Sequence, residues 1–330
     1  MIVDAVLGMG HGDEGKGKIT HHLLKSGEYT HCMRFNGGCN AGHTIFHNGQ
    51  KHVTHSIPSG VFHGITSIIG SGCVIDVDKL FKEINNLESA GVEVRKNLKI
   101  AHNAHIITRE SLEEDSTDTR IGTTRTGNGP TYRKKYNRSG VRAEDISKLQ
   151  PFLINTMEEF HLCNPTILME GAQGYSLDID WGDYPYVTSS NCGIAAVLQN
   201  GISPRHLRDI WGVSKIYETY VGNKYFQPPK KIFKTIQAIG NEYGATTGRP
   251  RQCNWIDIQQ LQKAVVANGV NKLVFNKMDI LREVGVWKVI EPEYNLIEFD
   301  GEDDIKIYLK NIFERKHNID LFFSDNPQTI

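Results

Sequence analysis

Short apolar runs alternate along this 330-residue chain with longer stretches in which apolar residues recur at helical spacing. The short runs are typical of buried strands and cover residues 2–8, 65–75, 166–172, 210–218, 272–281 and 319–325. The longer stretches are typical of helices and cover residues 76–91, 146–162, 255–269 and 303–317. This alternation predicts an α/β fold with a mostly parallel central sheet flanked by helices. The sequence shows no internal repeat or low-complexity linker, so we expect a single domain over residues 1–330.

The composition limits which partners the protein can bind and in which cellular compartment it can act. The formal net charge is −1, which gives the chain no general attraction to nucleic acid or to an anionic membrane. No window approaches 18 uninterrupted apolar residues, and Asp4 interrupts the first apolar run without a basic stretch before it. We therefore expect neither a membrane span nor a signal peptide. The six cysteines form no C-x-x-C pair, which is typical of free thiols in a cytoplasmic protein.

A glycine-rich stretch, GMGHGDEGKGK, follows the first apolar run at residues 8–18. From Gly10 to Lys16 it reads G-x-x-x-x-G-K, as in a phosphate-binding loop, but Gly17 stands where that loop has Ser or Thr. Between a strand and a helix, such a turn directs backbone N–H groups and the positive end of the helix at an anion, and Lys16 would neutralise phosphate charge. Phosphates would repel Asp13 unless it holds a cation or accepts a proton. The simpler alternative is that Asp13 and Glu14 only favour the helix N-terminus.

A second motif, FNKMD at residues 275–279, lies within an apolar run. Guanine presents two adjacent donors, N1–H and the 2-amino group, and one carboxylate such as that of Asp279 can accept both. Lys277 can lie along the face of the base. Four residues often match such a motif by chance. Following a phosphate-binding loop in the same α/β chain, however, they predict a GTP site.

Further polar segments decide between two kinds of GTP-binding protein. They are NGGCNAGHT at residues 36–44, EGAQG at 170–174, DYPYVTSSN at 183–191 and GATTGRPR at 244–251. A GTPase switch would need a loop threonine on Mg²⁺ and a carboxylate-glycine switch after a strand, and the sequence has no convincing form of either. So many hydroxyl and guanidinium groups favour an enzyme with two further anionic substrates. The polar stretches near 120–142 and 222–254 are expected to be long functional loops.

Nine motifs, taken in order along the chain, resemble the adenylosuccinate synthetase family. They are GDEGKGK, NAGHT, IPSG, IGTT, EGAQG, DYPYVTSSN, GNEYGATTGR, NKMD and FFSDNPQT. The chain is short for the family and is closer in length to its archaeal and viral members. The resemblance implies a ligase that joins L-aspartate to C6 of a 6-oxopurine nucleoside monophosphate and splits GTP to GDP and phosphate, with Mg²⁺ as cofactor. It implies neither a nucleic-acid nor a membrane partner.

The resemblance also implies roles for individual residues. Asp13 would take the N1 proton of the purine and would hold Mg²⁺ together with the carbonyl of Gly42. His43 and Lys16 would act at the phosphates, Gln173 would hydrogen-bond O6, and a 6-phosphoryl intermediate would form before the amine of aspartate displaces phosphate. The residues implied for GTP are Gly12, Glu14, Gly15, Lys16, Gly17, Gly42, His43, Thr44, Asn276, Lys277, Asp279 and Ser324.

The same resemblance assigns the other two substrates. The residues implied for the nucleoside monophosphate are Asp13, Asn40, Thr123, Thr124, Arg138, Gln173, Leu177, Thr188, Val221 and Gly222. Those implied for aspartate are Thr246, Thr247, Arg249 and Arg251. In the family, the residue at Arg138 reaches in from the partner subunit, so a homodimer is implied. For any single threonine or arginine, and for Ser324, the alternative is a surface hydroxyl or a solvated charge.

The sequence departs from the family pattern around the nucleoside. Cellular members usually read RVGAGPFPT where this chain has YVGNKYFQP at residues 220–228, and TTGRG where it has TTRTG at 123–127. His11 stands where a Trp is usual, and Pro250 and Gln252 replace arginines. Viral members of the family act on dGMP and make N6-succino-2-amino-2′-deoxyadenylate, a precursor of 2-aminoadenine in viral DNA. We therefore predict dGMP as the nucleotide, in the host cytoplasm if the source is viral, with IMP and adenylosuccinate as the alternative.

Overall fold

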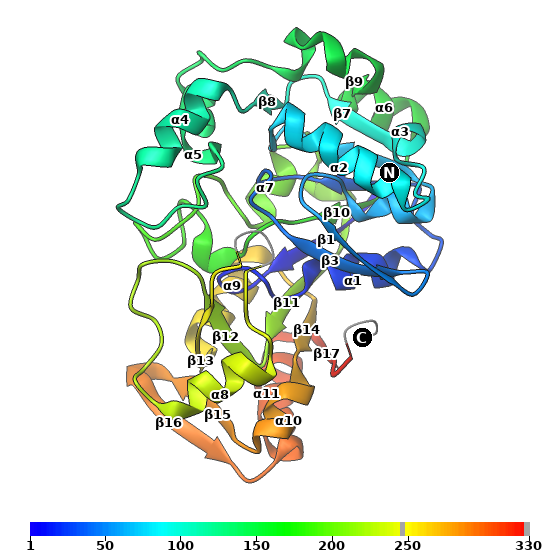
Figure 1. The fold of residues 1–330 in the computed structure, drawn as a ribbon. Coiled ribbons are helices and arrows are strands. Elements are labelled where there is room, and N and C mark those ends of the chain that lie inside the picture. Colours follow the sequence, from blue (N-terminus) through cyan, green and yellow to red (C-terminus); the bar gives the residue numbers. More distant parts are fainter. Residues whose placement is uncertain (245–247, 327–330) are drawn as a thin grey trace.

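The computed structural model describes residues 1–244 and 248–326 and has a nine-stranded central sheet (Figure 1). Every pair of neighbouring strands in this sheet is parallel. In spatial order the strands are β17 (Asp320–Phe323), β14 (Lys272–Asn276), β11 (Leu207–Lys215), β1 (Ile2–Gly8), β10 (Thr166–Glu170), β2 (His31–Arg34), β5 (Thr66–Ile69), β7 (Leu98–Ala101) and β9 (Leu153–Ile154). The predicted α/β fold with a mostly parallel sheet is confirmed.

Smaller sheets and eleven α-helices surround the central sheet within the described residues. A second sheet contains β12 (Tyr217–Tyr220), β13 (Gln252–Asp257), β15 (Trp287–Glu291) and β16 (Asn295–Phe299). Two strand pairs complete the set: β3 (His43–His47) with β4 (Gln50–Thr54), and β6 (Val74–Ile75) with β8 (His105–Ile106). The helices are α1 (Lys16–Leu24), α2 (Val77–Ser89), α3 (Val94–Asn97), α4 (Arg109–Thr117), α5 (Asn128–Tyr136), α6 (Thr156–Cys163), α7 (Ile194–Leu198), α8 (Lys231–Ile239), α9 (Ile258–Asn268), α10 (Met278–Val284) and α11 (Glu302–His317).

Strand β1 shows how the central sheet is buried on both faces. Val3, Ala5 and Leu7 belong to the large core that includes residues of α7, α9 and α11. Val6 points to the opposite face, where it belongs to the same core as Ile19 of α1. Successive side chains of a strand alternate between faces, so a strand covered on both sides is apolar at almost every position, and the one charged residue of β1, Asp4, is paired with Arg208.

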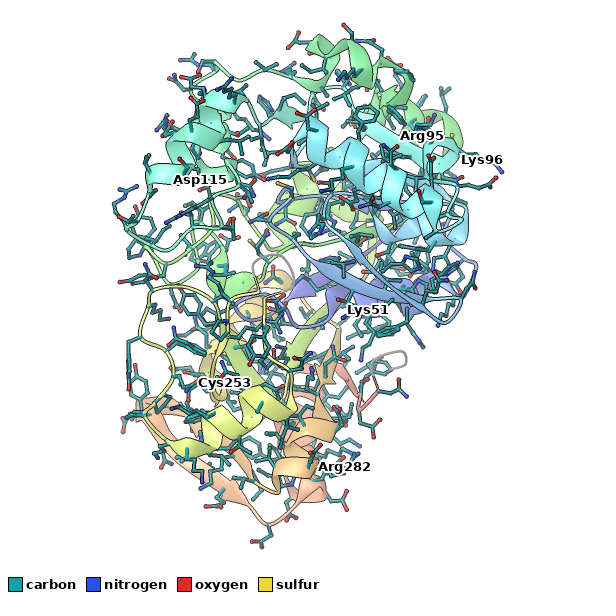
Figure 2. The ribbon with its side chains drawn as sticks, in the orientation of Figure 1. Lys51, Arg95, Lys96, Asp115, Cys253 and Arg282 are labelled. Carbon is teal, nitrogen blue, oxygen red and sulfur yellow. The ribbon has the colours of Figure 1, made fainter. Side chains whose placement is uncertain are left out.

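The pair α4–α5 and the second sheet lie at opposite ends of the molecule in Figure 1, above and below the central strand β1. Figure 2 labels one residue of each, Asp115 of α4 and Cys253 of β13. Asp115 is buried, and its Oδ2 atom accepts a hydrogen bond of 2.7 Å from the backbone N–H of Gly127, immediately before α5. A single carboxylate therefore joins α4 to the beginning of α5.

Two of the predicted helices have caps that explain where they begin. Asp76 accepts a hydrogen bond from the backbone N–H of Lys79 at the start of α2, and Asp257 accepts one from Gln260 at the start of α9. The prediction for residues 255–269 was therefore wrong at its first residues, because the chain is still in β13 as far as Asp257. Aspartate favours this position because its side chain satisfies an N–H group that the helix leaves unpaired.

Other predicted elements are divided in the structure. The run 65–75 gives β5 and β6, separated by residues 70–73, in which two glycines leave no room for a side chain: a Cβ atom on Gly72 would lie 2.0 Å from the carbonyl oxygen of Phe35. The predicted helix over 146–162 is instead the 3₁₀ helix η3 (Ser147–Phe152), β9 and α6, since Pro151 cannot continue a helical hydrogen-bond ladder. The run 210–218 divides into β11 and β12.

The two stretches that were predicted to be long loops also contain regular structure. Residues 120–142 include α5, and residues 222–254 include α8 and the start of β13. All six cysteines are free, and five are buried. Of the helices in the two described ranges, none combines the length and the apolar character that crossing a bilayer requires.

Candidate active site

A cleft of about 940 Å³ lies at the carboxyl ends of the central strands. The segments that follow β1, β2, β10, β11 and β14 all contribute to its lining, together with residues of α4 and α5 and of the loops on either side of α8. In open parallel sheets the ligand site commonly lies at this edge, where the loops after successive strands meet. Figure 2 labels Lys51 and Asp115, which line the cleft from the β3–β4 hairpin and from α4.

The glycine-rich loop divides its two carboxylates between the interior and the cleft. Glu14 is buried, and its Oε1 atom accepts hydrogen bonds from the backbone N–H groups of Gly10 at 3.1 Å and Gly12 at 2.9 Å. Its Oε2 atom lies 2.5 Å from Nζ of Lys16. Asp13 has a φ of 60° and lines the cleft. Glu14 therefore supports the shape of the loop, while Asp13 is available to a ligand.

The FNKMD segment lies directly against this loop. Nδ2 of Asn276 donates to the carbonyl oxygen of Glu14 at 2.7 Å. Lys277, with a φ of 69°, precedes α10, and both Lys277 and Asp279 line the cleft. Ser324 is buried behind them and accepts a hydrogen bond of 2.7 Å from Nζ of Lys18. The phosphate-binding pattern and the guanine-binding pattern, more than 250 residues apart in sequence, are thus neighbours in space.

His43 is held by a buried pair of charges. Its Nδ1 atom lies 2.5 Å from Oε1 of Glu170, and Nη2 of Arg34 lies 3.4 Å from the same oxygen. Burial would raise the pKa of Glu170, but Arg34 and His43 lower it to about 2. Burial and the charge of Arg34 lower the pKa of His43 to about 4. The ring is therefore neutral near pH 7, with the Nδ1 proton donated to Glu170.

Gln173 lines the cleft with an unsatisfied acceptor. It has a φ of 57°, and its Nε2 atom donates to Oδ1 of Asn40 at 3.2 Å. Its Oε1 atom is buried and has no hydrogen-bond partner among the described residues. The preceding residue is fixed by Asn36, which accepts from the N–H of Ala172 at 2.8 Å and donates to its carbonyl oxygen at 3.1 Å. A buried amide oxygen without a partner is a rare feature that a ligand donor can satisfy.

Arg249 and Arg251 enter the cleft from the segment before β13. Nη1 of Arg249 donates to the carbonyl oxygen of Gly122 at 3.2 Å. Nε of Arg251 donates to Oδ2 of Asp13 at 2.9 Å. Thr246 and Thr247, predicted as their partners in binding aspartate, lie outside the described residues.

Most of the remaining predicted residues also line the cleft. They are Gly12, Gly15, Lys16, Gly17, Gly42, Thr44, Thr123, Thr124, Leu177, Thr188 and Val221. Gly222 and Ser324 do not line it. Arg138 is exposed after the end of α5 and also lies outside the cleft of its own chain.

Three of the departures from the family pattern, His11, Gln252 and residues 220–228, contact one another on one side of the cleft. We call residues 220–228 the wall segment. The side chain of Gln252 makes four hydrogen bonds to its backbone: Nε2 donates to the carbonyl oxygens of Gly222 at 3.2 Å and Lys224 at 2.8 Å, and Oε1 accepts from the N–H groups of Phe226 at 3.0 Å and Gln227 at 3.1 Å. One carboxamide therefore sets the path of this segment.

His11 connects the glycine-rich loop to the same wall segment. Its Nε2 atom lies 2.9 Å from Oδ2 of Asp183, and its ring meets the ring of Phe226 edge-on with 5.0 Å between centroids. Asp183 also pairs with Lys224. Burial would lower the pKa of His11, but Asp183 and Glu218 raise it to about 9. This histidine is thus a cation, and it adds a charge to the wall of the cleft.

The sequence predicted no role for Arg34 and Glu170, or for the buried pair Lys215 and Glu242, in which Nζ of Lys215 lies 2.9 Å from the carboxylate of Glu242. Glu170 and Glu242 stand inside the quoted motifs EGAQG and GNEYGATTGR, so an acid within a motif was a usable signal. Arg34 and Lys215 end β2 and β11 without any motif. Their positions follow from the register of the sheet, which the sequence does not display.

The donors in the cleft fit a magnesium ion that is bound together with phosphate. Asp13 and Gly42 both line the cleft. Across the described ranges, no group of three or more His, Cys, Asp or Glu side chains is arranged to hold a metal ion. Mg²⁺ is commonly bound by one or two protein carboxylates, with substrate phosphates and water completing its shell. The chain therefore fits this mode of binding better than an all-protein cage.

Comparisons with known proteins agree with the motifs. The family model for adenylosuccinate synthetase matches residues 5–161 and 147–308. The adenylosuccinate synthetase of Chlorobium chlorochromatii is 38% identical over 337 residues, which cover 85% of this chain and 77% of the relative. That of Thermodesulfovibrio yellowstonii is 38% identical over 342 residues, which cover 88% and 80%.

Two solved structures share the fold. Fully ligated adenylosuccinate synthetase from Plasmodium falciparum has a TM-score of 0.88 and 29% identity, covering 99% of this chain and 98% of the other. Cyanophage S-2L succinoaminodeoxyadenylate synthetase, bound to dGMP and to dATP as energy donor, has a TM-score of 0.76 and 22% identity, covering 99% and 93%. The second likeness concerns the fold alone. From the family model and the relatives at 38% identity, we conclude that this chain belongs to the adenylosuccinate synthetase family.

Proposed function

We propose that this ligase uses GTP and Mg²⁺ to join L-aspartate to C6 of a 6-oxopurine nucleoside monophosphate. The observation that carries the proposal is the content of one cleft. The glycine-rich loop with Asp13, the guanine-type pair Lys277 and Asp279, and Arg251 all line it. Arg249 lines the same cleft, so two guanidinium groups stand beside the GTP residues, where they can bind the carboxylates of an amino acid.

The chemistry divides between proton transfer and charge stabilisation. Asp13 takes the N1 proton of the purine, which makes O6 nucleophilic toward the γ-phosphorus of GTP, and GDP leaves. Nε2 of Gln173, which has a second N–H beside the one donated to Asn40, would hydrogen-bond O6 and orient the nucleotide beside Asp13. Asp13 and the carbonyl of Gly42 would hold Mg²⁺, which would supply neutralisation of the phosphate charge when bound. The amine of aspartate then displaces phosphate from C6, so an oxo group that cannot leave is exchanged for phosphate, which can.

Lys16 and His43 bind the phosphates of GTP in this proposal and stabilise their negative charge. Lys16 begins α1, whose N-terminus faces the loop, and the helix end adds positive potential. Nε2 of His43 lies 3.4 Å from Nη1 of Arg34, an obligatory donor, so it carries a lone pair. A phosphate oxygen beside Nε2 would favour protonation of the ring, because a nearby anion stabilises the charged form.

IMP is the nucleotide that we propose first, with adenylosuccinate as the product. The relatives that are 38% identical to this chain are named adenylosuccinate synthetases. The sequence alone predicted dGMP ahead of IMP, and these relatives favour the alternative.

dGMP is a second candidate because of one local arrangement. His11, Gln252 and the wall segment are the positions that depart from the family pattern, and they contact one another. Thr119 and Gly122 adjoin the same place: Nδ2 of Asn223 donates to the carbonyl oxygen of Thr119 at 3.4 Å, and a Cβ atom on Gly122 would lie 2.8 Å from Oδ1 of Asn223. Changes that gather on one wall, while the residues for GTP and aspartate are kept, favour an altered nucleoside.

Two assays test these proposals. In the first, phosphate release is measured with GTP, aspartate or the purine nucleotide omitted in turn, and full turnover without aspartate would exclude the ligase. In the second, IMP, dIMP, GMP and dGMP compete in one mixture with saturating GTP, Mg²⁺ and aspartate. A site that satisfies the 2-amino donors of guanine should disfavour IMP by about 10-fold to 100-fold, because each unpaired buried acceptor is costly. A higher kcat/KM for IMP than for dGMP would exclude dGMP as the preferred substrate.

The assembly and location are also proposals. Arg138 is exposed and lies away from the cleft of its own chain, which suits a residue that completes a partner's nucleotide site in a homodimer. We further propose one domain over residues 1–330, acting in the cytoplasm, or in a host's cytoplasm if the source is viral.

A further inference from the structure

Four charged side chains, those of Lys215, Glu242, Arg251 and Asp13, contact one another in sequence beside the cleft. Glu242 is fully buried, and its carboxylate accepts from Nζ of Lys215 at 2.9 and 3.0 Å and from the hydroxyl of Tyr217 at 2.6 Å. Nη1 of Arg251 donates to the same carboxylate, and Nε of Arg251 donates to Oδ2 of Asp13 at 2.9 Å. Arg251 is thus the link between a buried acid and the carboxylate of the glycine-rich loop.

The backbone fixes Arg251 at the same place. Its N–H donates to the carbonyl oxygen of Glu242 at 2.9 Å, and its own carbonyl oxygen accepts from Nε2 of Gln237 at 2.6 Å. Tyr243 and Pro250 form a β-bridge between these residues. These contacts pair the described residues 242–244 with residues 249–251.

The guanidinium group retains capacity for an anion. Its side chain is 11% exposed, and Nη2 makes no hydrogen bond to any residue in the described ranges. An arginine commonly binds a carboxylate through two parallel N–H groups. A buried arginine needs a partner for its charge, and Glu242 supplies one that does not depend on a ligand.

We propose that Glu242 is a positioning residue, which holds Arg251 where it contacts Asp13 and can also receive the carboxylate of the amino-acid substrate. This inference rests on the function proposed above. When that carboxylate arrives, Arg251 gains a third anionic partner beside Glu242 and Asp13, and its hold on Asp13 weakens. Asp13 is then freer to accept the purine N1 proton. Binding of the amino acid and readiness of the base are thereby coupled through one guanidinium group.

The test compares three variants in steady-state assays with L-aspartate, GTP and IMP or dGMP, whichever the enzyme prefers. Glu242→Gln leaves Lys215 unpaired and risks the fold, so the double variant Lys215→Met/Glu242→Gln removes both buried charges together. In both, we expect the KM for aspartate to rise about 10-fold to 100-fold, the loss expected when a charged hydrogen bond is removed. The KM for GTP should change less than about threefold, a split that a general loss of structure would not produce.

Tyr217→Phe is the matched control, because it removes a hydrogen bond from the same carboxylate without touching Arg251. It should lower the melting temperature and leave the KM for aspartate within about threefold. The proposal is overturned if the folded double variant keeps the parent's KM for aspartate, or if Tyr217→Phe raises it equally. Failure of the unmodified enzyme to need aspartate would instead overturn the proposed function.

Discussion

Glu170 and His43 form a hydrogen bond of 2.5 Å that joins the end of β10 to the start of β3. Glu170 has no exposed surface, and Ser59 also donates to its carboxylate, from its N–H at 2.7 Å and from its hydroxyl at 2.9 Å. The histidine thus reaches the cleft in one orientation, with the tautomer set by a buried carboxylate.

Glu170→Gln should lower kcat about 10-fold to 100-fold, because the charge that orients His43 and favours its protonation is lost. The KM for aspartate should hardly change. The measurement is steady-state phosphate release by variants with normal circular dichroism. Ser59→Ala, which weakens the contacts of the same carboxylate and leaves His43 in place, is the control. Equal losses of kcat in both variants would show that Glu170 contributes only to the stability of the site and does not act through His43.

Asp279→Asn should change the preferred nucleoside triphosphate from GTP toward XTP. A carboxylate accepts both guanine donors, whereas an amide accepts one and presents its own N–H to the other. We expect kcat/KM for GTP to fall about 10-fold to 100-fold and that for XTP, whose base has an oxygen at C2, to rise. Parallel assays with GTP and XTP measure this change. An unchanged ratio would remove Asp279 from the guanine site.

Mixing two inactive variants should restore activity if Arg138 completes the partner's site. Asp13→Asn should cost about 100-fold to 10,000-fold, as expected for a lost general base. A mixed dimer with Arg138→Ala on one chain and Asp13→Asn on the other has one intact site. An equal mixture should reach about one quarter of the parent's activity, since half the dimers are mixed and each has one of two sites. A fully active monomer by light scattering would exclude this arrangement.

His21 and His63 should make the fold sensitive to acid. Nε2 of His63 lies 2.8 Å from Nδ1 of His21. Burial, and then nearby basic groups, lower the pKa of each ring to about 4 from an ordinary 6.5: His63 and Lys25 act on His21, and His47 and Lys25 act on His63. Between those values the unfolded chain binds more protons, so the free energy of unfolding falls as the pH falls from about 6.5 toward 4. Urea unfolding at a series of pH values measures the slope, and His63→Gln should flatten it.

Gln252→Ala should act on the nucleotide and on little else. Losing four hydrogen bonds to the wall segment should reduce kcat/KM for the nucleoside monophosphate at least about 10-fold, with the KM for GTP within threefold. Gln259→Ala, at an exposed position of α9, is the control. If Gln252→Ala keeps the selectivity of the parent among IMP, dIMP, GMP and dGMP, the wall segment does not read the nucleoside.

The sequence predicted the parts of this molecule whose signals are local. The apolar run of β1, the periodicity of α2 and the glycine-rich loop each depend on neighbours in the chain, and each was found where predicted. β2, with the sequence HCMR, was missed because its burial comes from its place between β10 and β5. The link between Glu242 and Arg251 was missed for a similar reason, since a buried ion pair has no periodicity.

The carboxamide of Gln252 fixes the backbone path of the wall segment independently of the side chains that the segment carries. All four of its hydrogen bonds go to backbone atoms, which every residue type other than proline supplies equally. Side chains at residues 223–226 can therefore be exchanged over many generations while the loop keeps its course. The nucleoside specificity of such a protein can change through single substitutions in the wall segment, each of which leaves the protein folded.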